Sequence, residues 1–335
     1  MKKIFLALIL VCMCVGCAET QTPVVTTTTP TTKTELVFDT AVTIAVYDNI
    51  SSTILTESFD ICKKLEEKYS KTIETSEVYL LNNSNGQAFS ATDELIMLIT
   101  KSLEFSELTD GLFDITTHSL SELWDFNNII PQLPLQEDID NALLKVSYEN
   151  IIIDGNNVTL LNDAKIDLGS IAKGYAADLV KAYLVSQGVE HATISLGGNV
   201  ITIGKKTDTD YWRVGIRDPF LADGTSLLAV DIDDLSVVTS GTYERNFVYD
   251  GVLYHHILNP FTGYPADSDV ISVTIISKES IVADLLSTAC FLVGIEEANV
   301  IIENMEDTEA IFITNDGKIS GTSGIGETIT AYIFE

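Results

Sequence analysis

The chain has 335 residues and carries 49 Asp and Glu against 19 Lys and Arg, which gives a formal net charge of −30. A polyanion of this kind excludes nucleic acid as a plausible partner, because phosphates repel it. The same charge argues against electrostatic adhesion to an anionic lipid surface.

The N-terminus has the pattern of a bacterial export signal. Lys2 and Lys3 precede an apolar run over residues 4–15, which has the length of a signal-peptide core and is short for a membrane span. Val15-Gly16-Cys17 is similar to a lipoprotein cleavage box, and an ordinary cleaved signal is the alternative. We therefore expect a signal peptide over residues 1–16 and an exported protein. A lipid on Cys17 would anchor it to the outer face of the cell membrane.

Residues 17–34 are rich in Thr, contain Pro and have almost no large apolar side chains. Such a segment cannot bury a core, so we expect a flexible tether followed by one large folded domain over residues 35–335. Cys62 and Cys290 lie among apolar neighbours in helical patterns. We expect buried free thiols there, and a disulfide is the alternative in an exported chain.

Apolar spacing places the main elements along the domain. Alternation at Val42, Ile44 and Val46 predicts a strand. A spacing of three and four residues predicts helices around residues 55–69 and 95–103, and another after Lys173 that ends at Gly188. Further strands are expected at 192–203, 211–217, 227–232, 235–239, 252–258 and 269–277, with a hairpin turn at 315–317. Helices in the first half and strands in the second indicate an α+β fold.

Residues 166–178 form the most informative segment. A short apolar segment is followed by a Gly169-Ser170 turn, and a helix is expected to begin after the turn with Lys173 in its first turn. Amides at a helix start attract anions, and a nearby Lys adds positive charge. The segment therefore suggests a phosphate site, although a plain strand-to-helix turn has the same pattern.

Several motifs occur in an order that resembles the ApbE family. They are Val37-Phe38-Asp39-Thr40, Ser76-Glu77-Val78 through Asn82, Asp110–Thr116, Asp167–Asp178, Ser195–Asn199, Trp212–Pro219, Thr239–Arg245, His255–Pro265 and Ala283–Ala289. Each motif is weak alone, but their order makes coincidence improbable. The resemblance runs from about Glu35 to the C-terminus and implies a mixed α+β fold with largely antiparallel sheets and packed helices.

The resemblance also implies a function. Members of this family are exported, Mg²⁺-dependent FAD:protein FMN transferases. They move FMN from FAD to a Thr or Ser hydroxyl of an exported or membrane redox protein and release AMP. Acceptor proteins of the family carry a motif like Asp/Ser-Gly-Ala/Ser-Thr/Ser. Two alternatives remain, a Mg²⁺-dependent FAD pyrophosphatase that yields FMN and AMP, and a non-catalytic flavin-binding lipoprotein.

Asp284 and Thr288 are the candidate metal ligands. They are four residues apart, so on a helix their oxygens share one face. A carboxylate, a hydroxyl, a main-chain carbonyl and phosphates are the donors that Mg²⁺ prefers. The family pattern places that carbonyl near Ser170. The alternative makes Asp284 a solvated charge and Thr288 a packing residue.

The other candidate residues contact FAD or move protons. The resemblance implies that FAD meets Phe38, Asp167, Lys173, Gly197, Gly198, Asn199 and Arg245. Phe38 replaces the usual Met of the family, and Gly197-Gly198 could equally be a plain turn. His256 is the candidate acid or base, because a neutral imidazole can take a proton from the acceptor hydroxyl. A structural role for His256 is the alternative, and the adjacent His255 competes with it.

Overall fold

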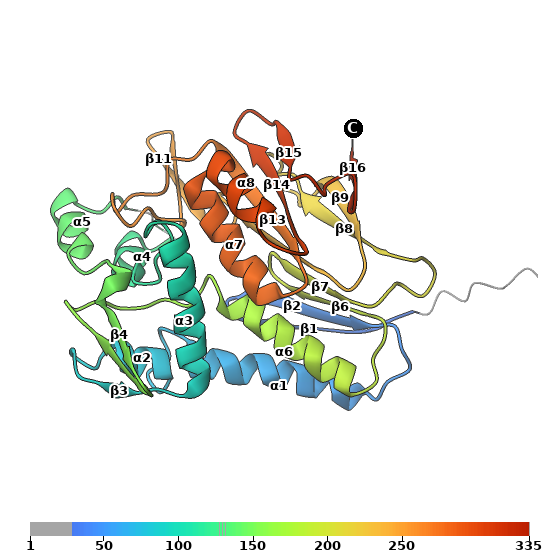
Figure 1. The fold of residues 1–335 in the computed structure, drawn as a ribbon, viewed down its shortest axis with the longest axis horizontal. Coiled ribbons are helices and arrows are strands. Elements are labelled where there is room, and N and C mark those ends of the chain that lie inside the picture. The colour runs from blue at the N-terminus through green and yellow to red at the C-terminus, as the bar shows by residue number, and fades with distance from the viewer. Residues whose placement is uncertain (1–28, 127, 129, 131, 335) are drawn as a thin grey trace, which may run out of the picture.

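The structure, a computed structural model, describes residues 29–126, 128, 130 and 132–334. An antiparallel eight-stranded sheet organises them (Figure 1), in the order β1-β2-β6-β7-β10-β13-β14-β15. Its strands are β1 (Thr31–Val37), β2 (Thr40–Val46), β6 (Ala192–Leu196), β7 (Asn199–Ile203), β10 (Ser236–Gly241), β13 (Val270–Ser277), β14 (Thr308–Thr314) and β15 (Ile319–Gly321).

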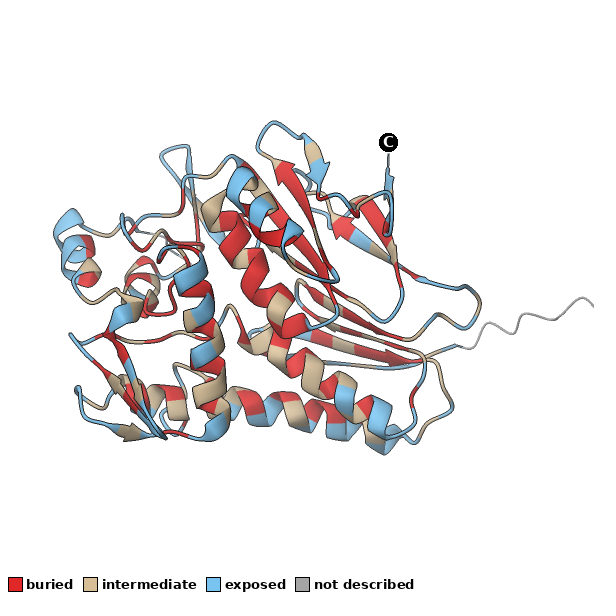
Figure 2. Cartoon of the chain, viewed as in Figure 1, coloured by how far each residue is buried: buried red, intermediate tan, exposed pale blue. Residues whose placement is uncertain are grey.

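Helices pack against one face of this sheet. They are α1 (Ser52–Tyr69), α6 (Ala172–Ser186), α7 (Ser280–Val293) and α8 (Ile295–Glu303). The face that α1 buries is the predicted one, since Leu55, Phe59, Cys62, Leu65 and Tyr69 are all buried. Figure 2 shows that α7 is buried along most of its length. The main hydrophobic core therefore lies between these helices and the sheet.

A three-stranded sheet forms a second core with the central strands. It consists of β8 (Trp212–Arg217), β9 (Ser226–Ile232) and β16 (Thr330–Ile333). On β13, Ile275 belongs to the main core and the next residue, Ile276, belongs to this second core. Because successive side chains of a strand point to opposite faces, β13 is covered on both sides, which accounts for the burial of nearly all of its residues.

The remaining elements form a lobe beside one end of the large sheet (Figure 1). They are α2 (Glu77–Asn82), β3 (Phe89–Ser90), α3 (Asp93–Leu108), α4 (His118–Trp124), α5 (Gln136–Leu143), the 3-10 turn η1 (Tyr148–Asn150), β4 (Ile151–Asp154), β5 (Asn157–Leu160), β11 (Asn246–Tyr249) and β12 (Val252–His255). The ring of Trp124 contacts Phe126, Phe247 and Tyr254, and this aromatic group holds the β11–β12 hairpin to α4.

The predicted α+β class with largely antiparallel sheets is confirmed. The strand expected over residues 192–203 is instead a hairpin, because the Gly197-Gly198 turn divides it into β6 and β7. Cys62 and Cys290 are buried free thiols, as expected. Within the described part of the chain, no helix combines the length and apolarity that a membrane crossing requires.

The expected boundary between tether and domain at residue 35 needs correction. Thr31–Thr34 belong to β1 and pair in register with residues 43–46 of β2. Thr is β-branched and suits an edge strand, where its side chains need no apolar cover. The folded part therefore includes the end of the segment assigned to the tether. The expected signal peptide, Cys17 and the tether up to residue 28 lie outside the described residues.

Candidate active site

The segment after Ile166 folds as its sequence predicts. The Asp167 carboxylate accepts a hydrogen bond from the Gly169 amide at 2.9 Å, and this bond shapes the turn before α6. The helix begins at Ala172, so Lys173 lies in its first turn. The Lys173 ammonium donates to the Gly169 carbonyl at 3.0 Å and is therefore held over the turn.

Asp284 lies on α7 and points its carboxylate at the start of α6. Oδ2 accepts the Gly174 amide at 2.8 Å, and Oδ1 lies 3.4 Å from the Lys173 ammonium. The Asp284 side chain is only 4 % exposed. These contacts exclude the interpretation of Asp284 as a solvated surface charge, because a buried carboxylate needs partners of this kind.

Thr288 lies one turn after Asp284, as the spacing predicts. Its hydroxyl is 3.3 Å from the Ser240 hydroxyl, which is also 2.8 Å from the hydroxyl of Ser287. Ser287 in turn donates to the Asp284 carbonyl at 2.9 Å. The last residues of β10 are thereby connected to the face of α7 that carries both candidate ligands.

The Gly197-Gly198 turn packs against its neighbours on both sides. A Cβ on Gly197 would lie 2.9 Å from the Thr40 hydroxyl, and one on Gly198 would lie 2.8 Å from the Thr239 carbonyl. Glycine therefore permits two close approaches here, of Gly197 to a side-chain hydroxyl and of Gly198 to a backbone carbonyl. The next residue, Asn199, is 1 % exposed, and its side-chain nitrogen Nδ2 has no hydrogen-bond partner among the described residues. An orphaned buried donor beside the turn is consistent with a ligand contact.

Phe38 lies at the tip of the first hairpin. Phe38 and Asp39 form its two-residue turn and both have positive φ, the type I′ geometry that suits strand twist. The Phe38 amide donates to Glu66 of α1 at 2.6 Å, which fixes the tip against the helix. Thr40 follows directly and contacts Gly197, so Phe38 and Gly197 lie at the same end of the sheet.

The structure gives the two adjacent histidines different roles. His255 is buried, bonds the Ala266 carbonyl through Nε2 at 3.2 Å and packs edge-on against Phe291. His256 places its Nδ1 3.3 Å from the Arg245 carbonyl. Because a carbonyl can only accept, Nδ1 carries the hydrogen and Nε2 is the nitrogen able to take a proton. Of the two, His256 therefore has the geometry of a base.

The surroundings of His256 keep its imidazole neutral. Burial, followed by the positive charge of Arg245, lowers its pKa to about 4. Lys173 also contributes to this lowering, so its ammonium acts on the same ring. The Arg245 side chain is exposed, and its backbone is the part that contacts His256. A neutral imidazole at physiological pH is the form that a general base requires.

Asp167 forms an ion pair that the sequence did not predict. The Lys71 ammonium lies 2.6 Å from its carboxylate and 3.2 Å from the Ser121 hydroxyl. Burial raises the pKa of Asp167, but the charge and hydrogen bond of Lys71 and the Gly169 amide outweigh it, so the pKa is lowered. Asp167 is therefore an anion that can hold a ligand group or the turn itself.

The donor set suits a metal that is bound together with phosphates. Within the described ranges, no three His, Cys, Asp or Glu residues form a group that could hold a metal ion. The buried Asp284 carboxylate and the Thr288 hydroxyl are available oxygens on α7, and the Lys173 ammonium that reaches Asp284 also bonds the Gly169 carbonyl of the turn before Ser170. Mg²⁺ typically takes one or two carboxylates and completes its shell with water and substrate phosphates, so these residues fit it.

The comparison with protein families decides the identity of the fold. A family model described as "ApbE family" matches residues 38–312, which is most of the chain. The chain belongs to the ApbE family. FAD:protein FMN transferase of Treponema pallidum is 32% identical over 316 residues, covering 88% of this chain and 87% of that protein. The enzyme of the same name from Klebsiella pneumoniae is 35% identical over 266 residues, covering 78% and 82%.

Solved ApbE structures share the architecture. The ApbE protein of Thermotoga maritima has a TM-score of 0.81 and 35% identity, covering 88% of this chain and 97% of that one. The flavin transferase ApbE of Vibrio cholerae has a TM-score of 0.78 and 26% identity, covering 88% and 98%. The mixed fold described above is therefore the ApbE fold.

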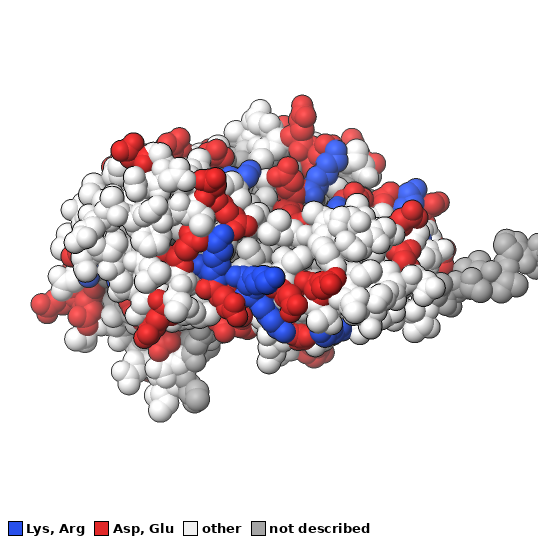
Figure 3. Space-filling view, turned by 90° about the horizontal axis from the view of Figure 1, so that it is seen from below, with Lys and Arg blue, Asp and Glu red and all other residues white. Residues whose placement is uncertain are grey.

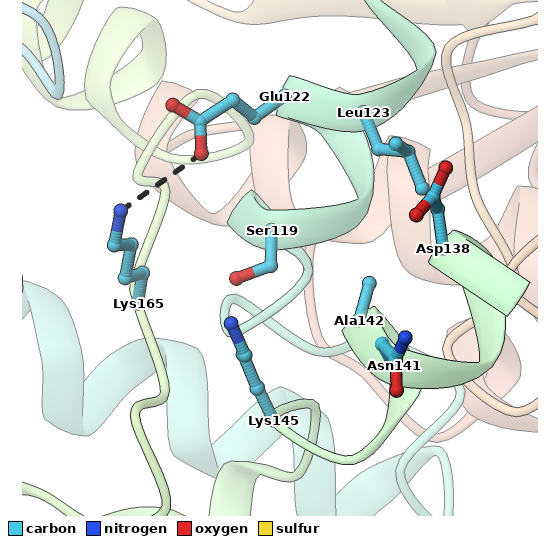
Figure 4. A pocket seen from close by; sticks show the side chains of 8 residues that line it. All are labelled: Ser119, Glu122, Leu123, Asp138, Asn141, Ala142, Lys145 and Lys165. Carbon is cyan, nitrogen blue, oxygen red and sulfur yellow. Dashed lines mark ion pairs between the residues drawn. The ribbon is translucent and has the colours of Figure 1, made fainter. Parts of the chain in front are cut away.

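A hollow of about 240 Å³ between α4 and α5 is separate from these site residues (Figure 4). It is lined by Ser119, Glu122, Leu123, Asp138, Asn141, Ala142, Lys145 and Lys165. None of the predicted ApbE site residues lines it, and its Lys165 is 3.9 Å from Glu122. The hollow is therefore not part of the candidate site around Asp284.

Proposed function

We propose that this ApbE-family chain catalyses Mg²⁺-dependent transfer of FMN from FAD to a Thr or Ser hydroxyl of an exported or membrane redox protein, with release of AMP. The family membership and the FAD:protein FMN transferases among its relatives support the reaction type. The observation that carries the proposal is the buried Asp284 carboxylate, which lies beside Lys173 at the start of α6.

The residues have distinct tasks in this reaction. Asp284, Thr288 and a carbonyl near Ser170 would hold Mg²⁺, and the ion would neutralise charge on the pyrophosphate. Lys173 turns from Asp284 toward the phosphates and adds positive charge there. Asp167, Phe38 and the Gly197-Gly198-Asn199 turn hold the FAD, and Arg245 positions His256.

The chemical step needs a base and an in-line attack. The acceptor hydroxyl oxygen bonds to the phosphorus of the FMN half, and the bond from that phosphorus to the bridging oxygen breaks. AMP leaves with the electrons of that bond. Nε2 of His256 accepts the hydroxyl proton, which is feasible because the ring is neutral. The products are the phosphoester of FMN with the acceptor and free AMP.

Three outcomes of one assay separate the candidate functions. The protein is mixed with FAD, Mg²⁺ and an acceptor domain that carries Asp-Gly-Ala-Thr, an instance of the proposed Asp/Ser-Gly-Ala/Ser-Thr/Ser motif. Covalent FMN on the acceptor is the expected result. Free FMN and AMP without acceptor would instead identify a pyrophosphatase, and unchanged FAD would identify a flavin-binding protein.

Asp284→Ala should abolish Mg²⁺-dependent turnover, because it removes the only carboxylate of the proposed metal site. The barrier should rise by several kcal/mol, on the order of the stabilisation that a catalytic metal supplies. Turnover is measured by AMP release, and folding by circular dichroism. Asp60→Ala, at an exposed position of α1, is the control and should retain activity. Normal metal-dependent turnover in Asp284→Ala would refute the assignment.

We also propose that the chain is exported and held to the outer face of the cell membrane by a lipid on Cys17. The apolar segment before Cys17 and the strongly negative charge of the chain support this, since an anion gains from a lipid anchor. Mass spectrometry of the mature N-terminus should find a lipidated Cys17, and Cys17→Ser should remove the lipid. A mature wild-type N-terminus at any other residue would contradict the proposal.

A further inference from the structure

The first turns of α6 and α7 lie closer together than most helix pairs allow. A Cβ on Gly174 would be 2.3 Å from the Ser280 carbonyl oxygen and 2.8 Å from the Cα of Ile281. No side chain larger than hydrogen fits between these backbones without a shift. The position of Asp284 relative to α6 therefore depends on how the start of α7 is held.

Each helix supplies a carboxylate to the N-terminal amides of the other. Asp284 of α7 accepts the Gly174 amide of α6 at 2.8 Å. Asp178 of α6 accepts the Ser280 amide at 2.9 Å and the Ile281 amide at 2.8 Å, both at the start of α7. In the described structure, neither helix is capped by the side chain of its own N-cap residue, Ile171 or Glu279. The exchange between helices replaces the usual local caps.

We propose that Asp178 is a positioning residue that sets the Asp284 carboxylate for metal binding by holding the N-terminus of α7. The proposal rests on the proposed metal role of Asp284. A carboxylate at a helix N-terminus satisfies amides that have no partner within the helix and is favoured by the helix dipole. Removing it frees α7 to move away from α6, and the Asp284–Gly174 bond then loses its geometry.

Asp178→Asn is the informative variant, because it keeps the shape and replaces one acceptor oxygen by an amide donor that faces a backbone donor. Supporting groups behind a metal ligand typically change metal affinity by about 10- to 100-fold. We expect Mn²⁺, titrated alone into the full-length protein and followed by electron paramagnetic resonance, to bind at least about 10-fold more weakly.

A second measurement needs no metal and no turnover. Amide hydrogen exchange in the metal-free protein should accelerate at Ser280 and Ile281 in Asp178→Asn. It should also accelerate at Gly174, whose partner is Asp284 and not Asp178. Faster exchange at Gly174 is the signature of positioning, because loss of a local cap alone would leave that amide protected.

Asp48→Asn is the matched control. The Asp48 carboxylate also accepts two backbone amides, those of Glu190 and His191, each at 2.8 Å. Asp48 comes just after Val46, the last residue of β2. The Phe38-Asp39 turn is at the other end of that strand, beside Thr40. This variant removes a carboxylate charge beside two backbone amides, as Asp178→Asn does, and should leave Mn²⁺ affinity and Gly174 exchange unchanged.

The outcomes separate the two proposals. Wild-type Mn²⁺ affinity together with wild-type exchange at Gly174 in Asp178→Asn would overturn the positioning role. Unchanged Mn²⁺ binding in Asp284→Asn would overturn the metal assignment, whereas the Gly174 exchange would still decide whether Asp178 positions Asp284. If Asp178→Asn does not fold, Asp178→Glu, which keeps both acceptor oxygens, is measured instead and should protect the amides of Ser280, Ile281 and Gly174. Protected Ser280 and Ile281 amides together with Gly174 exchange as fast as in Asp284→Asn would refute the proposal.

Discussion

At the scale of single residues, His256 shows how backbone geometry selects a protonation state. The Arg245 carbonyl receives the hydrogen of Nδ1, and the Arg245 charge opposes a second proton on the ring. The sequence favoured His256 as the acid or base but left His255 as a competitor, because the two residues are adjacent. Only the fold shows that His255 is buried against Phe291.

The lowered pKa of His256 predicts a pH dependence of stability. An unfolded His has a pKa of about 6.5, whereas the folded value is about 4. Between these values the unfolded chain takes up a proton that the native ring does not, so stability falls as pH falls from about 6.5 to 4. His256→Gln should reduce this decline in Tm. His118 and His255 will still contribute, because burial lowers their pKa values too.

The measurement is a series of thermal melts of both proteins from neutral pH down to about pH 4. Well above a pH of about 6.5, His256 is neutral in both the folded and the unfolded wild-type chain. The Tm values of wild type and His256→Gln should therefore differ by a constant amount there. A parallel decline of Tm in wild type and His256→Gln across the whole range would contradict a lowered pKa at His256.

The candidate site residues could be predicted only in part. The face shared by Asp284 and Thr288 follows from helical spacing, and Lys173 follows from its place after a glycine turn. The contacts of the site residues do not follow from the sequence. Lys71 and Asp167 are 96 positions apart, and no motif near Lys71 indicates that the two form an ion pair. The sequence also did not show that Ser240 contacts α7, although Ser240 lies in one of the family motifs.

At the scale of elements, the hairpin turn predicted at residues 315–317 connects β14 to β15 as expected, but the Gly197-Gly198 turn was not predicted. The alternation in residues 192–203 continues across Gly197-Gly198, so pattern alone gave one strand where the chain folds back. The same applies to β1, whose Thr-rich sequence matches both a tether and an edge strand. Tertiary pairing with β2 decides between them, and composition does not contain that information.

The extent of β1 predicts the effect of truncation. A chain starting at Glu35 loses Thr31–Thr34 and their pairing with β2, whereas a chain starting at Thr29 keeps the whole strand. Each lost hydrogen bond costs about 1 kcal/mol, and Tm falls by about 2–4 °C for each kcal/mol in a domain of this size. Thermal melts of the two truncated chains should show a clear deficit only for the one starting at Glu35. Equal Tm values would mean that this half of β1 adds no stability.

At the scale of the whole molecule, the fold is a layered assembly in which the candidate site residues lie where the helix layer meets the sheet. The α6–α7 pair covers one face of the large sheet, and the turns at Phe38-Asp39 and Gly197-Gly198 lie at one end of it. Asp284 and Thr288 come from the helix layer, and Ser240 and Asn199 from the sheet. Local sequence patterns predict the helices and strands of each layer. How the layers pack against one another depends on contacts between residues far apart in sequence.

The charge of the molecule predicts its response to salt. The net charge is −30, and acidic side chains are spread over the face in Figure 3, where basic side chains form one central group and lie at a few separate places. Such self-repulsion destabilises the compact state. Salt screens it, because the Debye length falls from about 30 Å at 0.01 M to about 8 Å at 0.15 M.

Ion pairs act in the opposite direction but are weak here. Exposed pairs such as Lys278–Asp307 and Lys318–Asp316 contribute little to stability, because water surrounds both partners and salt screens their attraction as well. Repulsion among 49 acidic residues should therefore dominate, and raising NaCl from about 0.01 to 0.15 M should raise Tm. The melts are run with a chelator and repeated with Asp284→Ala, which removes the proposed metal site, so that cation binding there cannot produce the rise. A Tm that falls with NaCl in both proteins would show that the ion pairs outweigh the repulsion.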